Sequence, residues 1–366
     1  MQTVKEFFKK YPNLVAAIKL VMFLYLFFLS LQMMGDSLKL FGADFSKSLI
    51  STTENPLVGL FIGILATSVI QSSSSTTSIV VGMVAGGALT IDTAIPIIMG
   101  ANIGTSVTNT IASLPQINRS NEFIRAFSAA TVHDYFNLLA VLIIFPLQYY
   151  TNFLGSLATN MADIFAGVGG LKFLSPVKAI TTPVVTLIKP YFIEMPWLMF
   201  AIALILLFIA LKYMVSSLKV IVVSRAKDWF DKYLFRTALR AFFVGIVLTI
   251  LVQSSSITTS LVVPMAGAGL LTLEQIFPYT LGSNIGTTIT AMLAALITGN
   301  IAAVTVAFAH LFFNISGILI LWPLKKVPII LARKFAEYST KNKLIPVAYV
   351  FIIFFIIPLL VIYLAN

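Results

Sequence analysis

The feature that most constrains the fold is a duplication within the chain. Residues 63–108 align with residues 245–290 without a gap, and about half of the aligned positions are identical. Such self-similarity between two hydrophobic segments indicates that one structural unit occurs twice. The fold must therefore contain two related halves.

Three polar motifs occur in both copies. In the first and second copy respectively they are QSSSSTTS (71–78) and QSSSITTS (253–260), GANIGTSVT (100–108) and GSNIGTTIT (282–290), and HDYFN (133–137) and HLFFN (310–314). A short length difference precedes the third motif. Each unit thus contains a serine-rich segment, a helix with an NIGT sequence and a helix with a histidine and an asparagine.

Apolar stretches of about the length that crosses a bilayer recur along the whole chain. The chain is 59% hydrophobic and only 10% charged, which excludes an ordinary soluble domain of 366 residues. There is no cysteine, so disulfides, thiolate catalysis and cysteine metal sites are excluded. With two histidines, we expect no multi-histidine metal site.

The net charge of +11 reports orientation rather than a nucleic-acid partner, because the basic residues gather in short segments between apolar runs. The three clusters are Lys5, Lys9 and Lys10; Lys219, Arg225, Lys227, Lys232, Arg236 and Arg240; and Lys325, Lys326, Arg333, Lys334, Lys341 and Lys343. Placing all three in the cytoplasm puts the N-terminus inside and the C-terminus outside. The run from Leu14 to Met34 is expected to be a retained first helix.

The serine-rich segments are predicted to be the tips of re-entrant hairpins. In Leu57–Gly87 the apolar arms on either side of Gln71–Ser75 are each too short to cross about 30 Å of hydrocarbon. If this first segment crossed fully, the cluster Lys219–Arg240 would lie outside. The first hairpin is therefore expected to open outward and the second inward, which is the inverted-repeat architecture of secondary transporters.

The predicted fold is an all-α polytopic membrane protein with two inverted repeats, each a broken-helix hairpin plus two membrane helices, and flanking helices. The expected membrane helices are 14–34, 94–114, 126–148, 197–217, 275–297, 301–323 and 345–364. The expected divisions are 1–56 (first helix and external loop), 57–150 (first repeat), 151–234 (external connector 151–194, linking helix and basic segment), 235–324 (second repeat) and 325–366 (basic loop and last helix).

The hairpin tips are candidates for an anion site. Serine favours the N-cap position, so each tip should begin a half-helix whose free N–H groups point into a cavity. Two facing helix starts can hold an oxyanion without lysine or arginine. Packing is the alternative, but duplication of the motif at the predicted break disfavours it. The predicted ligands are Gln71, Ser72, Ser73, Ser74, Gln253, Ser254, Ser255 and Ser256, with Asn102 and Asn284, for which structural hydrogen bonding is equally expected.

Asp134 lies in an apolar helix, where a carboxylate is costly and hence a functional candidate. Asn137 shares its helix face, whereas the second repeat has Leu311 in place of the acid. A carboxylate with amide oxygens suits a hard cation such as sodium. The two histidines are interpreted as structural. The predicted sodium ligands are Asp134, Asn137, Ser75, Thr76, Thr258 and Asn314.

Paired QSSS and NIGT motifs with an HDYFN helix resemble the type II sodium-dependent phosphate cotransporter family, from about Leu57 to the last helix. The resemblance implies sodium-coupled phosphate uptake with both QSSS tips around the phosphate. It implies that Asp134 serves an additional, electrogenic sodium and that Asn137 belongs to a sodium site. An acidic residue that the animal members have in the loop before the HDYFN helix is replaced here near Asn118–Arg119, so the resemblance leaves the sodium stoichiometry open. Animal members carry a long, cysteine-containing, glycosylated loop where this chain has 151–194, which favours a bacterial cytoplasmic membrane.

The leading functional hypothesis is a sodium–phosphate symporter that works by alternating access, with sodium as coupling ion and no organic cofactor. A carrier of another oxyanion, such as a dicarboxylate or sulfate, and a channel remain as alternatives. An intramembrane serine hydrolase is disfavoured, because the chain has no GxSxG motif and its histidines belong to other helices. We therefore expect a transporter and not an enzyme.

Overall fold

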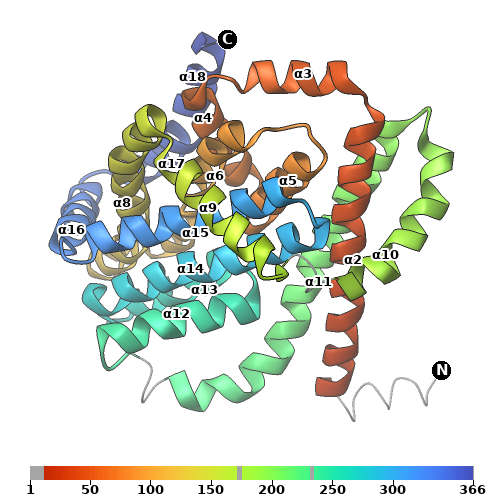
Figure 1. Cartoon of the computed structure of the whole chain (residues 1–366). Coiled ribbons are helices and arrows are strands. Elements are labelled where there is room, and N and C mark those ends of the chain that lie inside the picture. The colour runs from red at the N-terminus through yellow and green to blue at the C-terminus, as the bar shows by residue number, and fades with distance from the viewer. Residues whose placement is uncertain (1–11, 171–174, 231–234, 366) are drawn as a thin grey trace.

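The computed structural model describes residues 12–170, 175–230 and 235–365, and within these ranges every regular element is a helix (Figure 1). The prediction of an all-helical chain is thereby confirmed. The first basic cluster, Lys5 to Lys10, lies outside the described residues, as does Lys232.

The α-helices follow the predicted order, with additional elements between them. They are α2 (Pro12–Leu40), α3 (Ala43–Thr52), α4 (Pro56–Ile70), α5 (Ser73–Ala85), α6 (Ile91–Thr105), α7 (Val107–Ser113), α8 (Ser120–Thr151), α9 (Phe153–Gly167), α10 (Ser175–Ile188), α11 (Pro196–Phe230), α12 (Ala238–Val252), α13 (Ser255–Gly267), α14 (Leu273–Thr298), α15 (Ile301–Leu321), α16 (Lys326–Ser339), α17 (Leu344–Phe351) and α18 (Ile357–Ala365). A π-helical segment, Ile352–Ile356, joins α17 to α18.

Six helical spans in the described chain are long and apolar enough to cross a membrane: α2, α8, the first part of α11, α14, α15 and the continuous run from α17 to α18. The hairpin arms are different. Helices α5 and α13 have 13 residues each, which at about 1.5 Å per residue is shorter than the hydrocarbon layer. The prediction of short arms is confirmed. The direction in which each hairpin opens stays a prediction.

The predicted helix 94–114 is wrong as a single element, because it ends at Thr105 and resumes at Val107. At the junction the backbone N–H of Ser106 donates to the carbonyl oxygen of Ile103 at 3.2 Å, a tighter turn than the α-helical one. The aligned helix α14 runs unbroken through Thr288. The two repeats therefore differ in backbone at Ser106, where the second repeat has Thr288.

The predicted connector 151–194 contains two helices, α9 and α10. Helix α9 buries Leu154, Ala158 and Ala162, which recur every four residues along one face, and packs on α15. Helix α10 packs against α2. This segment is thus a packed part of the fold.

Close glycine contacts join the first arm of each hairpin to the following NIGT helix. A Cβ atom added at Gly63 or Gly100 would overlap a backbone oxygen of the facing helix in the α4–α6 pair. The same holds for Gly245 and Gly282 in the α12–α14 pair. Small residues let membrane helices approach this closely. Equivalent positions thus make equivalent contacts in both repeats.

Helices α2 and α11 lie side by side and belong to neither repeat (Figure 1). The rings of Phe23 on α2 and Tyr213 on α11 stack with their centroids 4.9 Å apart. Buried residues of this pair join a hydrophobic cluster with α5, α14 and α15. Packing on α2 and on this cluster thereby holds α11 next to the hairpins.

Candidate anion cavity and buried polar network

The two hairpin tips have the same local backbone. Gln71 (φ 57°, ψ 29°) and Gln253 (φ 52°, ψ 30°) end the first arms in the left-handed region. Ser72 and Ser254 then cap the second arms, with Oγ accepting from the N–H of the residue three positions on at 3.2 and 3.4 Å. The predicted breaks and serine N-caps are confirmed. The left-handed glutamines were not predicted, because glutamine rarely adopts positive φ.

The tips meet at equivalent residues. The hydroxyl oxygens of Ser73 and Ser255 lie 3.5 Å apart, and both side chains are buried. Each residue opens the first turn of its helix, where backbone N–H groups have no partner within the helix. Two partly positive helix ends are therefore brought together, as the anion-site hypothesis requires.

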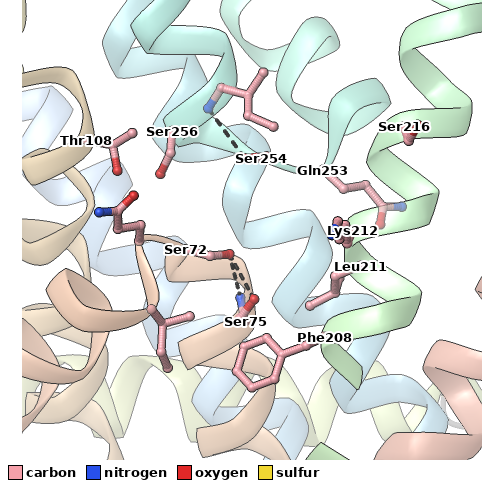
Figure 2. A pocket seen from close by; sticks show the side chains of 13 residues that line it. Ser72, Ser75, Thr108, Phe208, Leu211, Lys212, Ser216, Gln253, Ser254 and Ser256 are labelled. Carbon is pink, nitrogen blue, oxygen red and sulfur yellow. Dashed lines mark hydrogen bonds between the residues drawn. The ribbon is translucent and has the colours of Figure 1, made fainter. Parts of the chain in front are cut away.

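A cavity of about 470 Å³ lies beside the tips (Figure 2). Both hairpins contribute polar side chains to its wall: Gln71, Ser72, Ser75, Gln253, Ser254 and Ser256. Thr108 on α7 lines it as well. Five of the eight predicted hairpin ligands face this cavity, whereas Ser73, Ser74 and Ser255 do not line it.

Three polar atoms of this wall are buried and have no hydrogen-bond partner in the described chain. They are the hydroxyl oxygens of Thr108 and Ser256 and the amide oxygen of Gln253. Unpartnered buried polar groups are uncommon, since each costs about 1–3 kcal/mol. A polar ligand or water in the cavity would complete the hydrogen bonds of these three atoms.

A buried polar network joins the HDYFN helix of the first repeat to the NIGT helix of the second. The Nε2 atom of His133 lies 2.7 Å from Oδ1 of Asn284, whose Nδ2 donates to Oδ1 of Asn137 at 2.8 Å. Asn137 in turn donates to the carbonyl oxygen of Asn102 at 2.8 Å. Neither Asn102 nor Asn284 lines the cavity. Their predicted contact with substrate stays untested.

The corresponding residues of the second repeat do not form this network. Both ring nitrogens of His310 and the Oδ1 atom of Asn314 are buried and have no hydrogen-bond partner among the described residues. The Nδ2 atom of Asn314 donates to the carbonyl of His310, and that of Asn102 to the carbonyl of Ile98. The two halves thus share a sequence motif and differ in how its side chains are paired.

Asp134 is completely buried on α8. Its Oδ2 atom accepts hydrogen bonds from the hydroxyls of Thr110 and Tyr349, each at 3.2 Å, and its Oδ1 atom has no partner in the part of the chain that the structure describes. No basic side chain in the described ranges forms an ion pair with it. Tyr349 was not predicted, because α17 lies outside both repeats.

The other predicted sodium ligands are divided among separate places. Oγ of Ser75 donates to Oγ of Ser72 at 2.9 Å, and Thr76 donates to the carbonyl of Ser72 at 3.2 Å. Thr258 lies behind the second tip, 2.8 Å from the hydroxyl of Ser283. Within the described residues no hydrogen bond links Asp134 to these groups, and no cluster of three acidic or histidine side chains that could hold a metal occurs. A single site from all six stays a prediction.

Comparison with known proteins places these elements in a family. The Na+/Pi-cotransporter family model matches residues 26–173 and 206–326, which together are most of the chain. The chain belongs to this family. The matched residues include both hairpins, the cavity and the polar network, whereas Tyr349 lies beyond them.

Family members in mammals are similar along nearly the whole chain. Sodium-dependent phosphate transport protein 2B is 35% identical over 443 residues in both Pongo abelii and Homo sapiens, covering 94% of this chain and 64% of the relative. Sodium-dependent phosphate transport protein 2A of Ovis aries is 35% identical over 421 residues, covering 93% and 66%. The chain thus spans about two thirds of the length of these relatives. No solved structure matches.

Proposed function

We propose that this member of the Na+/Pi-cotransporter family is a sodium-coupled symporter of inorganic phosphate, with the phosphate held between the two hairpin tips. The observation that most supports this proposal is the contact between Ser73 and Ser255. It brings the N-termini of two serine-capped helices together beside a polar cavity. Such helix ends bind oxyanions through N–H groups and hydroxyls. The names of the mammalian relatives support phosphate as the anion and sodium as the coupling ion.

Alternating access is the mechanism we propose for the transport cycle. It is supported by the equivalence of the tips and glycine contacts in the two repeats, together with a charge distribution from which we infer opposite orientations of the repeats. In this structure the histidine and asparagine of the HDYFN helix are hydrogen-bonded to Asn284, whereas those of the HLFFN helix have no such partner among the described residues. We take this structure to be one of two related conformations of the transport cycle. In the other, Asn102 would pair with His310 and Asn314 as Asn284 pairs with His133 and Asn137.

The sodium side of the proposal rests on Asp134 and its surroundings. A buried carboxylate without a basic partner requires a cation or a proton. Hydroxyl, carboxylate and amide oxygens are the ligands that hard cations prefer. Asp134 and Asn137 on one face of α8 are therefore the proposed core of a sodium site. From the charge distribution we infer that the N-terminus and the basic segments face the cytoplasm, and the short connector 151–194 favours a bacterial membrane.

The decisive experiment is uptake of radiolabelled phosphate by purified protein in proteoliposomes, with and without an inward sodium gradient. We expect saturable accumulation above the external concentration only when sodium is supplied. Excess sulfate or a dicarboxylate should not compete. Competition by either would assign a different oxyanion, and uptake that merely equilibrates without sodium would indicate a channel.

A further inference from the structure

Helix α11 provides one wall of the cavity although it belongs to neither repeat. Phe208, Lys212 and Ser216 all line the cavity and follow one another at intervals of four residues, so they share one face of the helix. Figure 2 shows Phe208, Lys212 and Ser216 around the cavity together with Ser72, Ser75 and Gln253 of the hairpin tips. The repeats alone therefore do not complete the site.

The orientation of α11 is fixed by its neighbours in the sequence. Ala210 and Met214 are buried in the cluster that α11 shares with α2. Tyr213 stacks on Phe23 of α2. With these residues held on α2 and in the core, Lys212 is directed to the open side, where its side chain is exposed to the cavity.

Lys212 is the single charged residue among the described residues of the cavity wall. It lies in the last turn of the apolar span Pro196–Met214, and none of the ion pairs in the described chain includes it. The nearest aromatic ring is that of Tyr213, with its centroid 5.9 Å from Nζ. A lysine near the end of a membrane helix commonly extends toward the interface, whereas the side chain of Lys212 lines the cavity beside the hairpin tips.

We propose that Lys212 is an anion-binding residue of the cavity, whose ammonium group attracts phosphate and contacts it before or while the hairpin tips hold it. The inference rests on the proposed function. Lys212 supplies a positive charge that the serine tips lack. A fixed positive charge in a cleft with low-dielectric walls raises the local concentration of anions. Because the Coulomb energy scales with charge, divalent phosphate should be favoured over the monovalent form.

The first test compares three variants in the proteoliposome assay. Lys212→Gln should raise the phosphate KM about three- to tenfold with little change in kcat, and the difference should shrink at high ionic strength. Lys212→Arg keeps the charge and should remain near wild type. Lys47→Gln alters an exposed lysine on α3, outside the cavity, and should leave KM unchanged.

The second test uses the absence of native cysteine, which removes background labelling. Lys212→Cys should regain a low KM after modification with a cationic aminoethyl methanethiosulfonate and lose affinity further with the anionic sulfonatoethyl reagent. Phosphate with sodium should slow both reactions. Recovery by the cationic reagent also shows that the variant folds.

The outcomes separate this inference from the proposed function. Wild-type protein without sodium-dependent phosphate uptake would overturn both. Normal wild-type uptake with an unchanged KM in Lys212→Gln, or equal effects of the two reagents, would overturn the role of Lys212 alone.

Discussion

Ser73 and Ser255 occupy equivalent positions in the two repeats, and their hydroxyl oxygens lie 3.5 Å apart. A contact between equivalent residues means that each hairpin tip is positioned by its counterpart. Both repeats therefore shape the candidate anion site, and a substitution at one tip should alter the position of the other.

This coupling predicts non-additive effects. If phosphate is held between the tips rather than in the adjoining cavity, Ser73→Ala and Ser255→Ala should each weaken its apparent affinity by about ten- to a hundredfold, because each removes a hydroxyl donor to a charged group. The double variant should cost less than the sum, with a coupling energy of about 0.5–1.5 kcal/mol. Phosphate KM values of the four proteins give this number. Strict additivity would show that the tips act independently.

Ser256 provides a more local test of the cavity, since its hydroxyl lines the wall without a protein partner. Ser256→Ala should weaken phosphate binding by about 1.5–3 kcal/mol if that hydroxyl donates to the anion. The matched control is Ser260→Ala, because Ser260 donates to the carbonyl of Ile257 and lies outside the wall. Equal phosphate KM values for the two variants would contradict the assignment.

The glycine contacts predict a difference in stability. Gly63→Ala would place a Cβ atom against the backbone of Ile97 and Ala101, and such overpacking typically costs about 1–3 kcal/mol. Gly167→Ala is the control, because nothing lies within 4 Å of its added Cβ. Thermal unfolding in detergent should show a lower midpoint for Gly63→Ala alone. Similar midpoints would mean that α4 and α6 are not in backbone contact.

Part of this arrangement follows from sequence and part does not. The serine caps were predictable, because Ser72 and Ser254 follow apolar arms and serine favours N-caps. The break at Ser106 was not, since the similar segment around Thr288 stays helical. Lys212 escaped prediction because only the packing of α11 on α2 directs it to the tips. Motifs identify local structure, but they do not report which flanking helix completes a site.

The orientation inferred from charge can be tested on the same cysteine-free background. Asp44 on α3 is fully exposed, and Arg333 on α16 is about half exposed. A cysteine at Asp44 should react with an impermeant thiol reagent added outside intact cells, and one at Arg333 should react only after permeabilisation. If both react from outside, α3 and α16 lie on one side, and the inverted orientation of the repeats is lost.

Asp134 gives the sharpest test of ion coupling. Its carboxylate is buried, accepts from Thr110 and Tyr349, and has one oxygen without a partner. Asp134→Asn keeps the size and an oxygen ligand and removes the charge, so it should lower the Hill coefficient for sodium and weaken the voltage dependence. Phosphate should still be recognised, because the tips are unchanged.

Tyr349→Phe tests how much of the effect of Asp134 on sodium coupling depends on the position of its carboxylate rather than on its charge. The variant removes one hydroxyl donor, so it should raise the sodium concentration for half-maximal uptake and leave the voltage response intact. Uptake against sodium concentration, at two potentials set by potassium and valinomycin, distinguishes the variants. If Asp134→Asn alters neither the sodium curve nor the voltage response, Asp134 is no ion ligand. Coupling would then reside in the hydroxyls and amides of the hairpins, and a buried acid held by two hydroxyls would serve only to join α8 to α7 and α17.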